Sequence, residues 1–259
     1  MRSILLVTLL LLAAMIGDAQ PPASKVELQT QPEPLGINPQ QTALIVVDMQ
    51  NDFGAKGGMF DRAGIDIEPI RAIVPTVAKT IAAARSAGIK VVYLRMGFHP
   101  DLSDIGPHDA PNYLKHHRLH VGEPNIAPDG TASRILIRDT WDTDIVPELK
   151  PASGDIVIWK HRFSGFHETD LDATLKRLGV RYLIFTGATT SVCVESTMRD
   201  SMFLDYFPVL LSDATAEPLG HTVDQSNHKA SIRVLAALFG WVTDSNEFIR
   251  ALKSQTPKQ

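Results

Sequence analysis

Short apolar runs recur along the chain and alternate with longer stretches in which apolar residues follow helical spacing. Such runs are typical of strands buried on both faces of a sheet, and here they occupy residues 43–47, 89–94, 156–159, 182–186, 209–211 and 240–242. Helical patterns cover residues 67–87, 171–178, 194–204, 223–239 and 247–252. This alternation predicts an α/β class fold, a single-domain three-layer structure in which helices flank a parallel sheet.

The longest helical pattern, over residues 67–87, shows how strong this signal is. Its apolar residues recur every three or four positions, which places them on one helix face, and they are Ile70, Ile73, Val74, Val77, Ile81 and Ala84. The pattern stops at Gly88, and glycine is the residue that most often follows the last turn of a helix.

The first residues differ from the rest and predict three segments. Arg2 precedes an apolar stretch over residues 4–16, and small residues follow it up to Ala19, which is the pattern of a signal peptide over residues 1–19. We therefore expect an exported protein, periplasmic or secreted, without stable membrane insertion after cleavage; an uncleaved N-terminal anchor is the alternative. Residues 20–40 are rich in Pro and Gln, which indicates a flexible lead-in, and the folded domain is expected over residues 41–259.

Charge and cysteine content narrow the function. The 25 basic and 29 acidic residues give a net charge of −4, so no nucleic-acid partner is expected. Cys193 is the only cysteine of the chain, which excludes an intramolecular disulfide. A single cysteine is either a buried apolar side chain or a nucleophile, and the residues around it decide between the two.

Three reactive side chains follow three of the predicted strands. Asp48 comes directly after the first strand, Lys160 after the third, and Cys193 lies in the turn that follows the fourth. Because the carboxyl ends of parallel strands meet at one edge of a sheet, these residues are expected to lie close together.

An acid, an amine and a thiol suit nucleophilic attack on an unreactive carbonyl carbon. Asp48 would accept the thiol proton and later return it to a leaving nitrogen. A charged Lys160 would favour the thiolate and the carboxylate, and the helix that begins after Cys193 adds a positive partial charge. Taken singly, Asp48 is also compatible with a turn and Lys160 with a solvated strand end, so the functional interpretation depends on all three residues together.

Two segments around these residues resemble the signatures of the isochorismatase-like cysteine hydrolase superfamily. They are residues 42–53 (TALIVVDMQNDF) and residues 186–195 (TGATTSVCVE), with Lys160 between them in family order. The resemblance implies a catalytic triad of Asp48, Lys160 and Cys193. It also implies a cis peptide bond between Ala188 and Thr189, an oxyanion hole formed by the N–H groups of Thr189 and Cys193, no cofactor, and a homo-oligomer.

Within this superfamily the chain is most similar to the ureidoacrylate amidohydrolase branch. Residues 154–166, 193–197 and 239–242 carry this similarity, which implies a small-molecule amide or ureide as the substrate. Phe53, Arg162 and Phe163 are the expected substrate-binding residues, Phe53 by stacking and Arg162 by pairing with a carboxylate. The chain departs from the branch at Thr189, Ser191 and Phe163, where Ala, Asn and Tyr are usual.

Other functions stay open at this stage. Nicotinamidases of the superfamily bind a metal through an aspartate and two histidines, and the histidines at 116, 117 and 120 are the nearest approach to such a set; Pro and Gly around them favour a polar loop, and no metal site is expected. The segment from Gly97 to Asp139 shows no clear element and is expected to form a lid or a subunit contact. An exported small-molecule binder without catalysis is the remaining alternative.

Overall fold

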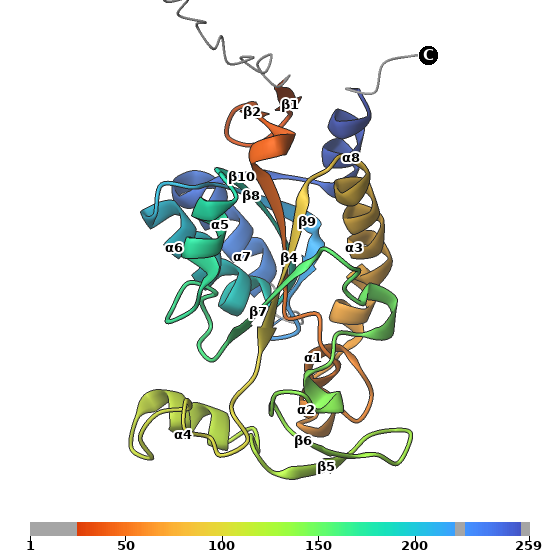
Figure 1. Ribbon diagram of the computed structural model, residues 1–259, viewed down its shortest axis with the longest axis vertical. Helices are drawn as coiled ribbons and strands as arrows, with labels where there is room; N and C mark the ends of the chain where they lie inside the picture. Colours follow the sequence, from red (N-terminus) through yellow and green to blue (C-terminus); the bar gives the residue numbers. More distant parts are fainter. Residues whose placement is uncertain (1–24, 221–225, 255–259) are drawn as a thin grey trace, which may run out of the picture.

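The computed structural model describes residues 25–220 and 226–254 and shows a six-stranded parallel sheet at the centre of the chain (Figure 1). The strands lie in the order β10-β9-β8-β3-β4-β7, and every neighbouring pair is parallel. Their bounds are β3 (Thr42–Val47), β4 (Lys90–Met96), β7 (Ile156–Lys160), β8 (Tyr182–Ala188), β9 (Phe207–Ala216) and β10 (Trp241–Thr243). Each strand overlaps one of the six apolar runs, so the predicted α/β fold with a parallel sheet is confirmed.

Helices cover both faces of this sheet, with α3 and α8 on one side and α5, α6 and α7 on the other (Figure 1). Their bounds are α3 (Glu68–Ser86), α5 (Leu171–Arg177), α6 (Glu195–Phe203), α7 (Asn227–Val234) and α8 (Ser245–Lys253), with the π-helical turns η4 (Thr190–Val194) before α6 and η5 (Leu235–Phe239) after α7. All six apolar residues predicted to share one face of the long helix are buried. Two apolar clusters, one on each side of the sheet, form the core.

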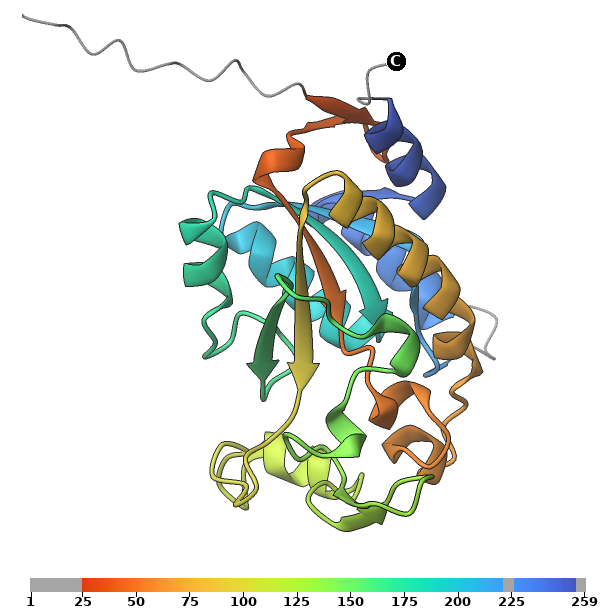
Figure 2. The same cartoon turned by 45° about the vertical axis from the view of Figure 1, so that its right-hand side comes forward.

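Several small elements gather beyond the carboxyl ends of the strands (Figure 2). They are α1 (Asn51–Gly54), α2 (Met59–Arg62), α4 (Pro111–His117), β5 (Pro124–Ile126), β6 (Ala132–Arg134), and the 3-10 turns η2 (Trp141–Thr143) and η3 (Pro147–Leu149). The segment from Gly97 to Asp139 therefore contains a helix and a hairpin that its Pro, His and Asp content did not predict. It lies where the ligand of a parallel α/β sheet is expected.

Residues 25–40, the described part of the lead-in predicted over residues 20–40, depart from that prediction. They form β1 (Val26–Leu28), β2 (Leu35–Ile37) and the short turn η1 (Pro39–Gln41), and β1 pairs with β2 in antiparallel register. The reason is alternation: Val26 and Leu28 point into the apolar cluster that contains Phe248 of α8, while Glu27 between them is exposed. Gln31 also exchanges two backbone hydrogen bonds with Val242 of β10, so this segment is part of the folded domain.

The signal peptide expected over residues 1–19 lies outside the described residues. Within residues 25–220 and 226–254, no helix has the length and apolar character needed to cross a membrane.

Candidate active site

The carboxyl ends of three strands bring Asp48, Lys160 and Cys193 together. Asp48 follows β3, Lys160 is the last residue of β7, and Cys193 lies in η4, the turn after β8. Lys160 Nζ lies 2.8 Å from Asp48 Oδ2 and 3.3 Å from Cys193 Sγ. The proximity expected from the strand order is therefore present.

Lys160 is completely buried and its ammonium group is surrounded by acceptors. Besides Asp48 and Cys193, it donates to the backbone oxygen of Arg162 at 3.2 Å and contacts Met96 Sδ at 3.6 Å. Met96 ends β4, the strand between β3 and β7, and pairs with Lys160 in the sheet. The lysine side chain thus reaches past the end of β4 to the carboxylate, and a buried ammonium group requires such partners.

Burial and charge act against each other on the ionisable groups of this site. Burial raises the pKa of the Asp48 carboxyl group, and the Lys160 ammonium opposes the shift without cancelling it. Burial lowers the pKa of Lys160, but the Asp48 carboxylate and the hydrogen bonds to Asp48 and Cys193 raise it, and the net direction is upward. Burial also raises the pKa of the Cys193 thiol. These directions favour a protonated thiol beside the Lys160 ammonium ion.

Gly187 allows β8 to approach the end of β3. Its φ angle is +109°, and a Cβ atom at this position would lie 2.1 Å from the backbone oxygen of Val47. Only glycine fits such a close contact. Because Val47 precedes Asp48 and β8 leads into the turn that carries Cys193, this contact sets the separation between the carboxylate and the thiol.

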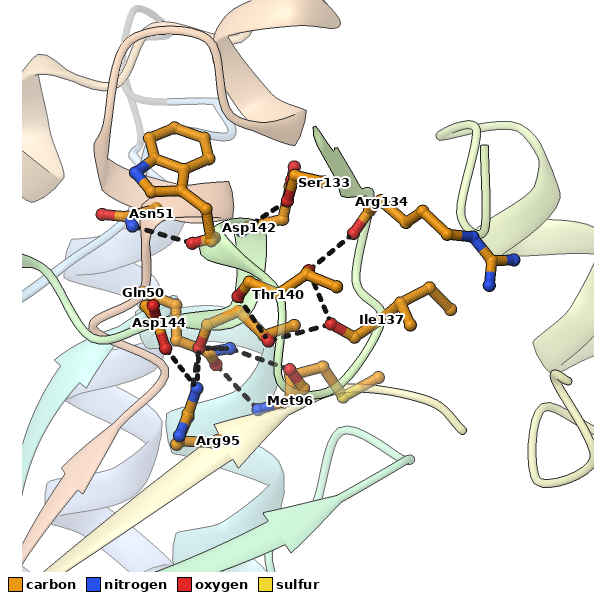
Figure 3. A network of polar contacts seen from close by, with 12 residues as sticks. Gln50, Asn51, Arg95, Met96, Ser133, Arg134, Ile137, Thr140, Asp142 and Asp144 are labelled. Carbon is orange, nitrogen blue, oxygen red and sulfur yellow. Dashed lines mark hydrogen bonds and ion pairs between the residues drawn. The ribbon is translucent and has the colours of Figure 1, made fainter. Parts of the chain in front are cut away.

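Hydrogen bonds to Gln50 and Arg95 anchor the loop after Asp48 (Figure 3). The Gln50 side-chain amide donates to Met96 O at 2.8 Å, and its oxygen accepts from Met96 N at 2.7 Å. The same amide and the Arg95 guanidinium both donate to Thr143 O, at 2.9 and 2.7 Å. These bonds join the loop after β3 to the end of β4 and to η2, which anchors the backbone that follows Asp48.

The thiol and the carboxylate open into a cavity of about 430 Å³. The residues that line it are Asp48, Phe53, Met59, Phe60, Ile65, Met96, Lys115, His116, Leu119, Leu136, Phe163, Ala188, Thr189, Val192, Cys193 and Leu219. The wall is mostly apolar, as in most small-molecule sites. The segment between Gly97 and Asp139 supplies part of this wall.

Two of the three expected substrate-binding residues line the cavity. Phe53 is nearly buried and packs edge to face on Phe60, with ring centroids 5.1 Å apart. Phe163 is 43% exposed and forms another part of the wall. Arg162 does not line the cavity: its guanidinium donates to the backbone oxygens of Asp104 and His161 at 3.0 and 2.8 Å, so the structure does not place it for pairing with a substrate carboxylate there.

The sequence did not single out His116 and Lys115 as cavity residues. The polar loop predicted around the histidines is wrong for residues 111–117, because Pro111 opens helix α4, a position that proline favours. His116 Nδ1 lies 2.7 Å from Asn112 O, one helical turn earlier, and the ring packs against Phe98 and Phe163. The available signal was Pro111, since proline is favoured at the first position of a helix.

Among residues 25–220 and 226–254, no three His, Cys, Asp or Glu side chains lie close enough together to hold a metal ion. His116 is bonded to a backbone carbonyl, as described above, and His120 is exposed and contacts Glu123 at 3.0 Å.

Comparison with known proteins decides the family. Residues 42–247 match the isochorismatase domain. The chain belongs to the isochorismatase family. Its match begins with β3, which leads to Asp48, and extends past the turn that carries Cys193, so it includes all three residues of the site.

Other isochorismatase-family proteins resemble this chain over most of its length. The ureidoacrylate amidohydrolase RutB of Variovorax paradoxus is 42% identical over 235 residues, covering 91% of this chain and 90% of that protein. The RutB protein of Serratia proteamaculans is 40% identical over 235 residues, covering 90% and 92%. A cysteine hydrolase from Pseudomonas syringae pv. phaseolicola has a similar structure, with a TM-score of 0.70 and 33% identity, covering 84% of this chain and 95% of that one. The protein is thus an isochorismatase-family hydrolase.

The backbone at the family's second signature matches what the resemblance implied. The peptide bond between Ala188 and Thr189 is cis, and it lies directly before η4. Thr189 and Cys193 both line the cavity.

Proposed function

We propose that this isochorismatase-family protein is a cysteine-dependent amidohydrolase that cleaves a C–N bond of a small amide or ureide. Cys193 acts as the nucleophile, and Asp48 acts first as the general base and then as the general acid. Lys160 is the cation that contacts both Asp48 and Cys193. The observation that carries this proposal is the buried Lys160 ammonium group in contact with the Asp48 carboxylate and the Cys193 sulfur at the wall of a cavity.

The first half of the reaction forms an acyl-enzyme. The Cys193 sulfur attacks the carbonyl carbon of the substrate while its proton passes to Asp48, and the carbonyl oxygen becomes an oxyanion. Asp48 then returns the proton to the substrate nitrogen, the C–N bond breaks, and an amine or ammonia leaves. The acyl group remains on Cys193 as a thioester, or as a thiocarbamate if the substrate is a ureide.

The second half regenerates the thiol. Asp48 takes a proton from a water molecule, whose oxygen attacks the thioester carbon, and the proton then moves to the departing Cys193 sulfur. The product is a carboxylic acid or a carbamate. Lys160 keeps its charge throughout, since its raised pKa favours the protonated amine, and it lowers the cost of the thiolate that forms and leaves.

We place the oxyanion at the N–H groups of Thr189 and Cys193. Both residues line the cavity and lie at the two ends of one turn of chain. Two backbone donors fixed in a turn stabilise a developing negative charge without having to reorient during the reaction.

The printed activity of the relatives supports an amide or ureide as substrate. The relatives with about 40% identity are named ureidoacrylate amidohydrolases. The departures at Thr189 and Phe163 alter side chains that line the cavity, whereas Ser191 donates to the Glu217 carboxylate. The substrate of this chain is expected to differ in the part that Thr189 and Phe163 contact.

Ammonia release from a panel of small amides and ureides, compared with the Cys193→Ala variant, tests the proposal. We expect at least one compound to be hydrolysed by the wild type, the activity to vanish in the variant, and a metal chelator to leave it unchanged. Activity retained in Cys193→Ala contradicts the thiol mechanism. Loss of activity with the chelator supports a metal-assisted reaction instead, and binding without hydrolysis supports a non-catalytic role.

A further inference from the structure

The cavity beside Cys193 is large and apolar for a site that acts on a small acid. Phe53, Phe60, Ile65, Leu119 and Leu136 form much of its wall, and its volume is about 430 Å³. An apolar protein cavity of about 150 Å³ is already large enough to bind benzene. The acyl part of the substrate therefore has room for a ring with a further substituent.

The basic groups near the cavity are not arranged to pair with a buried carboxylate. Among the described residues that line the cavity, Lys115 is the only lysine or arginine, and it is exposed on α4. Lys160 lies behind the thiol with its ammonium group already bound to Asp48. Arg162 donates to two backbone oxygens outside the wall.

His116 presents an uncharged ring to the cavity. Its Nδ1 must carry the hydrogen, because the backbone oxygen of Asn112 only accepts. Burial lowers the pKa of His116; the hydrogen bond to Asn112 opposes this shift, and the charges of Lys160 and Arg162 add to it. The lowered pKa favours the neutral ring, whose Nε2 is then an acceptor and offers a carboxylate no partner.

We propose that the site takes an uncharged amide or ureide whose apolar, aromatic-sized acyl group fills this cavity, in preference to an acidic substrate of equal size. This inference rests on the proposed function, because it places the scissile carbonyl at Cys193. A carboxylate in the cavity would lose its hydration without gaining a charged partner, which is costly.

Binding to the full-length Cys193→Ala protein tests the preference without any need for turnover. The probes are 4-methylphenylacetamide and 4-carboxyphenylacetamide, which carry an uncharged methyl group or a carboxylate group at the same ring position. Calorimetry is expected to give a Kd at least tenfold lower for the methyl compound. Equal affinities, tighter binding of the carboxylate compound, or no binding of either would overturn the inference.

Two further variants in the Cys193→Ala background place the effect in the cavity. Phe163→Arg adds a guanidinium group at a half-exposed wall position and is expected to shift the ratio of the two Kd values at least tenfold toward the carboxylate compound. Val157→Arg, which adds the same group at a 40% exposed position outside the cavity wall, is expected to leave the ratio unchanged. A ratio that does not move in Phe163→Arg, or that moves as far in Val157→Arg, contradicts the assignment.

Ammonia release by the wild type from the same two compounds separates this inference from the proposed function. Binding preference for the methyl compound without hydrolysis of either contradicts the proposed function for these ligands and leaves the ligand preference standing. Faster hydrolysis of the carboxylate compound, lost in Cys193→Ala, supports the proposed function and overturns the preference.

Discussion

At the residue scale, Lys160 carries a charge that is fully buried and is stabilised mainly by Asp48 at 2.8 Å. Lys160→Met keeps the length of the side chain and removes the charge, which leaves the Asp48 carboxylate without its ion-pair partner. Removing one partner of a buried ion pair costs about 3–5 kcal/mol. We expect a loss of stability of this order at pH 7, measured by urea denaturation.

Lys176→Met is the matched control for this change. Lys176 is 63% exposed and pairs with Asp172 on the surface of α5, where loss of an ion pair costs about 0–1 kcal/mol. Because burial raises the pKa of Asp48, lowering the pH protonates the unpaired carboxyl group, and the cost of Lys160→Met should shrink. Equal losses for the two lysines would contradict the role given to Lys160.

Asp48→Asn tests the proton transfer. An amide cannot accept the thiol proton, and loss of a general base typically lowers the rate by about 10²–10⁴. In the wild type, the raised pKa of Asp48 means that activity rises with pH through a midpoint above the ordinary range of aspartate. The pH profile of kcat/KM should lose this rise in Asp48→Asn. A variant that keeps both the wild-type rate and the rise with pH would exclude Asp48 as the base.

The sequence predicted that Asp48, Lys160 and Cys193 would lie close together because each follows or ends a strand of a parallel sheet. The carboxyl ends of such strands meet at one edge, and Lys160 reaches Asp48 although β4 lies between β7 and β3. The sequence could not predict the direction of Arg162, because hydrogen bonds from its guanidinium to the loop around Asp104 depend on tertiary contacts. Nor could it show that His116 lies in the cavity wall.

At the element scale, the contact between Gly187 of β8 and Val47 of β3 determines how close the two strands lie. It therefore also determines the distance between the reactive groups that follow them. Gly187→Ala places a Cβ atom 2.1 Å from Val47 O. We expect β8 to shift away from β3, with a fall in activity and a loss of stability larger than the roughly 1–3 kcal/mol of backbone strain alone. Thermal denaturation and kcat of the purified variant measure both effects.

Gly154→Ala provides the control, because Gly154 also has a positive φ angle, +95°, but a Cβ atom there would have nothing within 4 Å. The two variants share the strain of the left-handed backbone and differ in the close contact. Similar losses in both would show that the contact with Val47 has no effect of its own.

The elements beyond the strands are joined by two buried carboxyl groups, Asp52 of α1 and Asp142 of η2. Asp52 accepts from the backbone N–H groups of Met59 and Leu136 at 2.9 and 2.8 Å. Burial, and then the charge of Asp142, raise the pKa of Asp52 well above its ordinary value. A raised pKa in the folded state gives stability at low pH that is lost as the pH rises through that pKa.

We therefore expect the free energy of unfolding to fall less with rising pH in Asp142→Asn than in the wild type. The amide oxygen can still accept from Asn125, and the amide nitrogen can donate to Ser133, so both hydrogen bonds of Asp142 survive. As the pH rises above the ordinary pKa of aspartate, we expect the free energy of unfolding to fall more steeply in the wild type than in the variant, because the pKa of Asp52 is raised well above that value. Asp144→Asn, which alters a carboxylate that is 59% exposed, should behave like the wild type, and an unchanged slope in Asp142→Asn would contradict the coupling.

The elements that the sequence predicted well are those with long apolar periodicity. Strands β3 and β8 are buried along their whole length and α3 buries one apolar face, so packing agrees there with the local pattern. The β1–β2 hairpin has only three apolar residues buried in the core, which are Val26, Leu28 and Ile37. The Pro and Gln residues around them hid the alternation of apolar and polar positions that is typical of a strand. Helix α4 was missed because its histidines and its lysine carry no apolar stripe.

At the scale of the whole molecule, α6 and η5 expose an apolar surface. Phe203 is 66% exposed and Leu238 69% exposed, and the Phe203 ring contacts Phe239 with centroids 6.0 Å apart. Large exposed apolar side chains that cluster in this way are typical of interaction sites. Together with the resemblance, this surface predicts a homo-oligomer.

Sedimentation of the wild type and of a Phe203→Ser, Leu238→Ser double variant measures the assembly. We expect an oligomer that dissociates in the double variant. A wild type that stays monomeric at micromolar concentration, or a double variant with unchanged sedimentation, would assign this surface another role.

The acyl-enzyme on Cys193 is the central claim, and its mass tests that claim most directly. Protein mixed with a hydrolysed amide, quenched in acid during turnover and measured by intact mass spectrometry should gain the mass of the acyl group. Digestion should place this gain on the peptide that contains Cys193, and Cys193→Ala should show none. Steady turnover without any acylated protein, or with the acyl group on another residue, would contradict the mechanism.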